Sequence, residues 1–297
     1  MYPRPFAYHR TASLKEAASL LEQLGPEAKL LAGGQSLIPL MKLRLADPAH
    51  LVDLNFVPGT AYIRQEGDRL RFGPLARHAE IENSEIASRI PILHDCAAGI
   101  ADVQVRNRGT LAGSLAEADP SGDWAAVLLT LDTEVRCLGV SSERTVGLAD
   151  FIKDAYTTVL GPNELISEVS VKIPAKHSGG TYLAFKRCAP VYASAAVAVQ
   201  LTLEDGRCRD ARICLAAVGL TPIRAREAEG ALQGKPISQQ TINTAAEAAR
   251  AAADPQPDMR GSAAFKRQLV AALTRRAIDV ALRRAHGEQV EVSHNYA

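Results

Sequence analysis

Two glycines follow a short apolar segment near the start of the chain, within Lys29–Leu37. Because they lack a Cβ atom, Gly33 and Gly34 can adopt positive φ angles and aim successive backbone N–H groups at one cluster of ligand oxygens. Gln35 and Ser36 add polar side chains. These residue types predict an anion-binding loop at a strand end, where phosphate sites are common. A Gly-Gly turn after a strand is more often only a turn, so that simpler interpretation stays open at this stage.

A second group of small residues lies within Val105–Leu115, and an acidic turn, Ala118–Asp123, follows it closely. Two anion-type loops in one chain suit a long ligand with a diphosphate in its middle, which describes a dinucleotide. The hydroxyls of Thr110 and Ser114 would donate hydrogen bonds, and the Asp123 carboxylate would accept them from sugar hydroxyls. The alternative is an ordinary glycine turn beside a solvated charge cluster, and the spacing alone favours neither interpretation.

The elements that must position the first loop form a predicted strand–helix–strand unit. Apolar residues at helical spacing predict a helix that begins at the capping residue Thr11 and ends at Gly25–Pro26. A strand should lead into the loop, a short helical turn over Leu37–Lys42 should follow it, and a second strand is predicted at Leu51–Leu54. If the two strands are parallel, the loop lies at a carboxyl end.

The middle of the chain predicts short strands that alternate with helices. A hairpin is expected around Glu66–Asp68, and helices are expected over Ile81–Ser88, over Ile92–Ile100 and from Trp124 onward. The clearest alternation of apolar and polar residues, Leu165–Pro174, predicts a half-buried strand.

A small, polar, Gly-rich segment, His177–Gly180, separates two strong strand patterns and is the candidate domain boundary. Three strands are predicted beyond it, which suggests an antiparallel sheet, and they cover residues 181–187, 195–201 and 211–218. Helices are predicted in the Ala- and Arg-rich segments 241–253 and 262–285. The predicted fold class is therefore α+β.

The composition excludes several classes of function. With 34 basic and 33 acidic residues and a net charge of +1, the 297-residue chain shows no charge excess for nucleic acid or an anionic membrane. The five cysteines are scattered and form no Cys-x-x-Cys pair, so neither a disulfide framework nor an iron–sulfur or zinc site is predicted. No signal-peptide core or membrane-spanning apolar run is present, which predicts a cytoplasmic protein without membrane insertion.

Taken together, these motifs resemble the FAD-binding medium subunits of the molybdenum hydroxylases, the family of carbon monoxide dehydrogenase and xanthine dehydrogenase. The resemblance covers nearly the whole chain. It is carried by Ala32–Ser36 with Pro39–Ala46, by Leu51–Leu54, and by Gln104–Ser114 with Ala118–Pro120 and Asp123.

The resemblance implies an α+β architecture in two parts. An FAD-binding domain of the PCMH type, residues 1–176, would consist of subdomains at about 1–57 and 58–176 with FAD between them. A C-terminal α+β domain, residues 177–297, would contain a three-stranded antiparallel sheet with helices. These boundaries agree with the Gly-rich segment noted above.

The resemblance also implies residue roles. Ala32–Ser36 would surround the FAD diphosphate, Thr110–Ser114 would form the second flavin-binding loop, and Asp123 would contact the cofactor. In more distant relatives, positions matching Ile166 and Lys186 lie at the flavin. The complete implied set of cofactor-binding residues is Lys29, Leu30, Leu31, Ala32, Gly33, Gly34, Gln35, Ser36, Leu37, Ile100, Thr110, Leu111, Ala112, Gly113, Ser114, Asp123, Ile166 and Lys186. No catalytic base and no metal ligand is implied on this chain.

Two positions depart from the family pattern. The family commonly has a second glycine where this chain has Ala112, which alters the loop slightly. Many members have an acidic residue before an aromatic where this chain reads Pro190-Val191-Tyr192, a change beside the flavin ring or a neighbouring lid.

In that family the substrate is oxidised at a molybdopterin centre on a large subunit, and two-iron clusters on a small subunit pass electrons to the flavin. The resemblance thus implies an electron-transfer subunit in a dimer of heterotrimers, a heterohexamer, that serves an external acceptor. A pocket on another chain would select the substrate. Two alternatives are a self-contained flavoprotein oxidase or nicotinamide-dependent reductase of the same fold, and a binding or assembly protein that has lost flavin.

Overall fold

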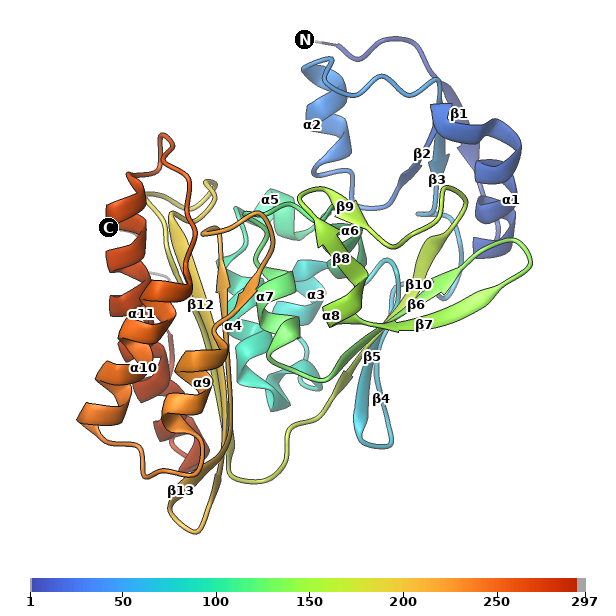
Figure 1. The fold of residues 1–297 in the computed structure, drawn as a ribbon. Helices are drawn as coiled ribbons and strands as arrows, with labels where there is room; N and C mark the ends of the chain where they lie inside the picture. Colours follow the sequence, from blue (N-terminus) through green and yellow to red (C-terminus); the bar gives the residue numbers. More distant parts are fainter. Residues whose placement is uncertain (1, 293–297) are drawn as a thin grey trace.

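The computed structural model describes residues 2–292, so Met1 and the end of the predicted C-terminal domain, 293–297, lie outside the described residues. Three parts follow one another along the chain: an N-terminal lobe, a middle part with a five-stranded sheet, and a C-terminal sheet covered by helices (Figure 1). The α+β fold class is confirmed.

The N-terminal lobe is built on a three-stranded sheet of order β1-β3-β2, in which both pairs are parallel. Its elements are β1 (Ala7–Arg10), α1 (Leu14–Leu24), the 3-10 turn η1 (Gly25–Glu27), β2 (Ala28–Leu31), α2 (Leu37–Lys42) and β3 (His50–Asp53). Ser13, rather than Thr11, caps α1, because its hydroxyl accepts from the Glu16 N–H while Thr11 donates to the Asp53 carbonyl. Strand β1 was not predicted, since its short sequence has no apolar alternation and it forms by pairing with β3.

The middle part contains a five-stranded antiparallel sheet of order β4-β5-β10-β6-β7 and a separate small hairpin. The strands are β4 (Ile63–Glu66), β5 (Arg69–Phe72), β6 (Thr133–Leu138), β7 (Glu143–Gly147), β8 (Ile152–Asp154), β9 (Thr157–Thr158) and β10 (Leu165–Lys172). The helices are α3 (His78–Glu82), η2 (Ala87–Arg89), α4 (Pro91–Gly99), α5 (Val103–Arg106), α6 (Leu111–Glu117), α7 (Trp124–Leu129) and α8 (Leu148–Phe151).

Two expectations for this part were wrong. The single helix over Ile81–Ser88 is instead α3 and η2, because Asn83 ends α3 and the Ser84 hydroxyl accepts from Ala87 N–H to start a new turn. Strand β10 is almost wholly buried rather than half buried. Its two faces join different apolar clusters: Leu165 packs with α1, whereas Ile166 packs in the central core.

The C-terminal part is an antiparallel sheet of order β11-β12-β13-β14 with three helices. The elements are β11 (Ser178–Phe185), β12 (Ala195–Glu204), β13 (Arg207–Ala216), β14 (Ile223–Arg224), α9 (Arg226–Leu232), α10 (Gln239–Ala252) and α11 (Ala263–Ala285). The sheet has four strands rather than three, because Ile223–Arg224 pairs with the end of β13. So short a strand carries no sequence pattern of its own.

The Gly-rich segment His177–Gly180 is largely part of a strand, since β11 begins at Ser178. A Cβ atom on Gly179 would lie 2.1 Å from the Ala281 carbonyl oxygen, so the glycine permits α11 to approach the sheet backbone closely. The division of the chain at residues 176 and 177 stays a prediction.

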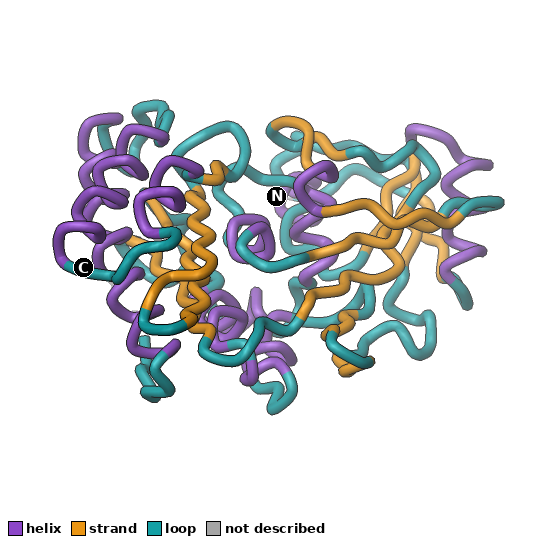
Figure 2. The backbone as a smooth tube through the Cα atoms, turned by 60° about the horizontal axis from the view of Figure 1, so that its bottom comes forward, coloured by secondary structure: helices purple, strands orange, loops and turns teal. Residues whose placement is uncertain are grey.

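One apolar core joins the middle and C-terminal parts. Helices α4 and α7 contact the C-terminal sheet, and α6 and α8 contact the five-stranded sheet. The buried cluster accordingly contains Phe72 and Val169 from one sheet together with Tyr182 and Ala198 from the other. Figure 2 shows helices on both sides of the C-terminal strands, which therefore form an inner layer.

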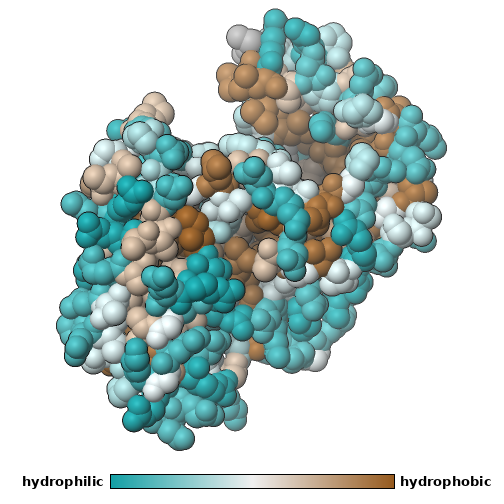
Figure 3. Space-filling view, in the orientation of Figure 1, coloured by the Kyte–Doolittle hydropathy of each residue, from teal (hydrophilic) through white to brown (hydrophobic). Residues whose placement is uncertain are grey.

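Hydrophobic residues are visible on the N-terminal lobe and in the depression below it (Figure 3). On this lobe Leu43 and Leu45 follow α2 with exposed fractions of 63% and 74%. Among residues 2–292, no helix is long and apolar enough to cross a membrane.

Candidate cofactor-binding site

The first loop, Ala32–Ser36, leaves β2 at the carboxyl end of the parallel pair β2–β3, as expected. Gly34 has a φ of +72°, a left-handed conformation that glycine adopts without steric cost. Within residues 2–292, the backbone N–H groups of residues 33–36 donate no hydrogen bond. Successive free backbone donors of this kind can bind an anion.

The second loop is also the start of a helix, because Thr110 caps α6 and its hydroxyl accepts from the Gly113 N–H at 3.0 Å. The expected turn of small residues is therefore a helical N-terminus, whose partial positive charge favours an anion. The Thr110 side chain is buried, so its first role is to cap the helix. The Ala112 methyl is buried in the apolar core and so points away from the loop surface.

The two loops touch through their backbones. A Cβ atom on Gly33 would lie 2.4 Å from the Arg108 carbonyl oxygen and 2.7 Å from the Gly109 Cα. Any other residue at position 33 would therefore push the loops apart. The structure therefore brings both small-residue segments into direct contact, which neither segment indicated alone.

A second group of residues forms a polar cluster around Asp123. The Asp123 Oδ1 accepts from the Tyr182 hydroxyl at 2.6 Å and lies 3.8 Å from the Lys186 Nζ. Lys186 also donates to the carbonyl oxygen of Gly99, next to Ile100. All of these side chains are less than a tenth exposed. Burial, followed by the Asp123 charge, raises the pKa of Tyr182 well above its ordinary value, so Tyr182 stays a hydrogen-bond donor.

Three other predicted residues lie outside the two loops and the Asp123 cluster. Ile166 is buried in the central core beside an irregularity in β10. Leu30 packs against the core of the N-terminal lobe, whereas Lys29 is exposed on β2. The sequence did not predict Tyr182 as a site residue. The one indication of its role is that it lies four residues before Lys186 in the strand pattern.

His78 is a buried residue that contacts the second loop. Its Nδ1 accepts from the Trp124 indole N–H at 3.0 Å, and its backbone N–H donates to Gly109 O at 3.1 Å. Burial, with smaller effects from Arg77 and Arg106, lowers the pKa of His78 from 6.5 to about 3. The ring is therefore neutral at pH 7 and acts as an acceptor in the core.

This pKa gives a pH prediction. Between pH 6.5 and 3 the unfolded chain binds a proton at His78 that the native chain does not, so native stability falls as the pH falls. The loss should be about 1.4 kcal/mol per pH unit. His78→Gln keeps an acceptor for Trp124 without this titration. Urea unfolding at pH 6 and pH 5 should show a steeper loss for the natural protein, and equal slopes would contradict the assignment.

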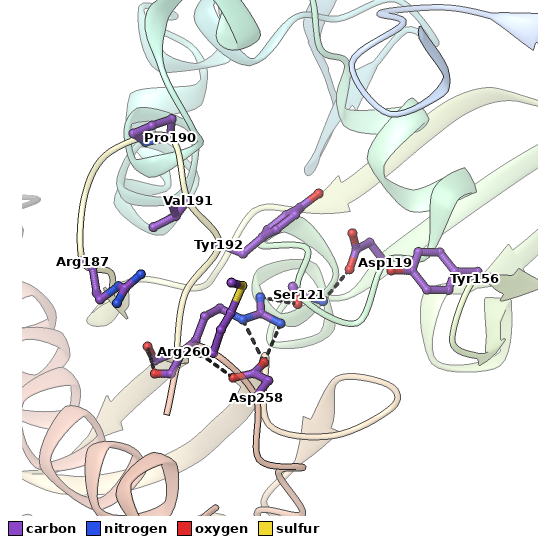
Figure 4. Close-up of a pocket in the computed structure, with 11 residues that line it drawn as sticks. Asp119, Ser121, Tyr156, Arg187, Pro190, Val191, Tyr192, Asp258 and Arg260 are labelled. Atoms are coloured by element: carbon purple, nitrogen blue, oxygen red, sulfur yellow. Dashed lines mark hydrogen bonds and ion pairs between the residues drawn. The ribbon is translucent and has the colours of Figure 1, made fainter. Parts of the chain in front are cut away.

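A cavity of about 520 Å³ opens next to Asp119 and Ser121 of the α6–α7 turn (Figure 4). Its walls come from the α6–α7 turn, the β8–β9 hairpin, the β11–β12 loop and the segment before α11, and include Asp119, Tyr156, Tyr192 and Arg260. The departure Pro190-Val191-Tyr192 therefore forms part of a cavity wall.

Arg260 donates to the Ser121 hydroxyl at 2.9 Å and pairs with Asp258. These contacts tie the wall before α11 to the α6–α7 turn that carries Asp123. Among residues 2–292, no group of three or more metal-ligating side chains is found.

Comparison with known proteins identifies this architecture. Residues 4–176 match the family model described as the FAD binding domain in molybdopterin dehydrogenase, and residues 180–281 match the CO dehydrogenase flavoprotein C-terminal domain. The chain belongs to the FAD-binding medium subunits of the molybdenum hydroxylases. Members of this family are oxidoreductase subunits.

Several relatives align over nearly their full length. The chain is 39% identical to the 6-hydroxypseudooxynicotine dehydrogenase complex subunit alpha of Paenarthrobacter nicotinovorans, covering 99% of this chain and 100% of the relative. It is 37% identical to the carbon monoxide dehydrogenase medium chain of Afipia carboxidovorans, covering 96% and 99%.

Solved structures agree with this assignment. A carbon monoxide dehydrogenase from Hydrogenophaga pseudoflava superposes with a TM-score of 0.93 at 38% identity, covering 96% of this chain and 99% of that one. Quinoline 2-oxidoreductase from Pseudomonas putida 86 gives a TM-score of 0.91 at 36% identity, with coverages of 96% and 99%.

Proposed function

We propose that this medium subunit binds FAD between its two loops and carries electrons from iron–sulfur clusters of a partner subunit to an external acceptor. The observation that supports this most is the backbone contact between Gly33 and Arg108–Gly109, which joins four free N–H groups to the start of α6. Such a set of successive backbone donors suits a diphosphate. FAD, when bound, supplies a ring that takes up and releases electrons.

The residues of the chain would bind and orient the cofactor. In this proposal the N–H groups of Ala32–Ser36 and the N-terminus of α6 hold the diphosphate. The free oxygen of Asp123 accepts from sugar hydroxyls, while Tyr182 fixes the carboxylate. Lys186 brings a buried positive charge, and Ile166 an apolar contact. Of the remaining members of the predicted set, Lys29, Leu30 and Leu31 lie on β2, Leu37 and Leu111 begin α2 and α6, and Ile100 follows the end of α4.

The relatives suggest the partners. Those named above include chains of multisubunit dehydrogenases, and one related enzyme is described as a Cu,Mo-CO dehydrogenase. We therefore propose a large molybdopterin subunit and a small iron–sulfur subunit, assembled as a dimer of heterotrimers in the cytoplasm. The exposed Leu43 and Leu45 support a subunit contact near the first loop.

Purification of the native complex and of the chain alone tests this proposal. The chain alone should bind one FAD, show flavin absorbance and turn over little. The complex should contain molybdenum and iron, and rapid mixing with its substrate should reduce the flavin after the clusters. Full activity of the chain alone, with nicotinamide or a small substrate, would favour a self-contained flavoenzyme. A protein that stays colourless after FAD addition would favour a chain that has lost flavin.

Lys186 gives a prediction about the redox potential. Replacing it with methionine removes a buried cation 3.8 Å from Asp123 and leaves that carboxylate with its Tyr182 bond alone. Since positive charge favours the electron-rich reduced flavin, Lys186→Met should make the midpoint potential of the bound flavin more negative. Spectroelectrochemical titration measures it. Lys172→Met, at an exposed position on β10, is the control, and an unchanged or more positive potential in Lys186→Met would contradict the role.

A further inference from the structure

We propose that Asn55 and Arg77 form a bracket that holds the two FAD-binding loops at the spacing that the cofactor diphosphate requires. Both are positioning residues, since neither belongs to the loops themselves. The inference rests on the proposed function, because it assumes that the loops bind FAD. It adds two residues that no loop motif contains.

Asn55 follows β3 and reaches the first loop. Its Nδ2 group donates to the Ala32 carbonyl oxygen at 2.9 Å and to the Asp53 Oδ1 at 2.6 Å. Its backbone N–H also donates to that Asp53 oxygen, at 2.8 Å, while the Tyr8 hydroxyl holds the other oxygen at 2.5 Å. With both amide hydrogens directed at oxygens, the side-chain Oδ1 of Asn55 is left to face Arg77.

Arg77 precedes α3 and reaches from Asn55 to the second loop. One nitrogen of its guanidinium donates to the Asn55 Oδ1, and another donates to the Arg108 carbonyl oxygen. Its own backbone N–H is held by the Glu80 carboxylate at 2.8 Å, which fixes the start of the side chain. A planar guanidinium can serve two acceptors in different directions, which an ammonium group does less well.

The bracket and the loop contact share one atom. The Arg108 carbonyl oxygen that accepts from Arg77 is also the oxygen that a Cβ atom on Gly33 would meet at 2.4 Å. The chain of bonds runs from Ala32 through Asn55 and Arg77 to Arg108, so it spans the two predicted subdomains at the point where the loops touch. Losing either side chain would free the Arg108 peptide to turn and the loops to separate.

A purely structural role in joining the subdomains would have a different result, because it would lower stability without selective loss of FAD affinity. The bracket instead predicts that the effects of Asn55 and Arg77 on FAD affinity are coupled. Asn55→Ala and Arg77→Met break the same bridge, so their effects on FAD affinity should be non-additive in a double-mutant cycle.

The experiment titrates FAD into the full-length apo chain while following flavin fluorescence. We expect each single variant to weaken FAD binding by about tenfold or more, and the double variant by little more than one single variant. At saturating FAD the absorption spectrum of the bound flavin should be unchanged, since the bracket acts at the diphosphate loops. Arg77→Lys should also weaken FAD binding, and it replaces Arg77→Met in the double-mutant cycle if Arg77→Met does not fold.

Arg89→Met is the matched control, because Arg89 bonds Gln65 on the exposed surface away from the loops. Thermal unfolding of each apo variant measures stability separately. The bracket would be overturned by unchanged FAD affinity in the variants, by additive losses, or by an equal loss in Arg89→Met. In each of these cases, FAD binding by the natural chain would still support the proposed function. A natural chain that binds no FAD would overturn both.

Discussion

Gly33→Val should weaken FAD binding by about 100-fold or more while the chain still folds. The added Cβ would lie 2.4 Å from a backbone oxygen and 2.7 Å from a backbone carbon of the second loop. Backbone atoms cannot move away as the end of a flexible side chain can, so the loops must separate. Titration of the apo chain with FAD, with circular dichroism to confirm folding, measures the effect.

Gly147→Val is a suitable control, because a Cβ atom there meets nothing within 4 Å. Gly34→Val should also reduce FAD occupancy, since position 34 requires a positive φ and its Cβ would meet the Ile38 side chain at 2.7 Å. Full FAD occupancy in Gly33→Val would show that the loop contact is not needed for the cofactor.

Arg284→Met should lower the free energy of unfolding by about 3–5 kcal/mol, because it leaves a buried carboxylate without its cation. The Arg284 guanidinium donates to both oxygens of Asp95, at 2.6 and 3.0 Å, and to the Gly180 carbonyl at 2.7 Å. The side chains of the pair are 8% and 2% exposed. Urea unfolding at constant pH measures the loss, provided that the transition is two-state.

The neighbouring residue provides the comparison. Arg283 pairs with Glu288, and both side chains are about half exposed, so Arg283→Met should leave stability unchanged within the precision of the measurement. Equal effects of the two substitutions would mean that the Asp95 pair contributes no more than a surface contact.

The sequence predicts local features of this fold well. Gly-Gly after an apolar segment indicated a loop at a strand end, and the loop does leave β2 beside the parallel strand β3. The helices α1, α2, α4, α7, α10 and α11 follow from the apolar patterns of their own segments, and a serine side chain caps each of α1, α10 and α11. Such features depend on neighbours along the chain, so single segments encode them.

The features that the sequence does not predict depend on distant contacts. Asn55, Arg77 and Tyr182 matter through partners far away in the chain, such as the 59 positions between Tyr182 and Asp123. No spacing rule connects them. The short strands β1 and β14 form by pairing with β3 and β13, which are distant or separate segments of the chain. The 3-10 turn η2 is an exception, because it arises from a local turn that interrupts the apolar spacing. The individual roles of the predicted FAD-binding residues stay predictions.

The apolar core shared by the two sheets affects how parts of this protein can be exchanged. Cutting the chain at residue 177 would expose the faces of α4 and α7 that now cover the C-terminal strands. It would also remove Tyr182 and Lys186 from Asp123. A chimera that takes its C-terminal half from a relative must therefore match this buried surface and this polar cluster together. Under the proposed function, FAD binding would then be thermodynamically coupled to the folding of the C-terminal half.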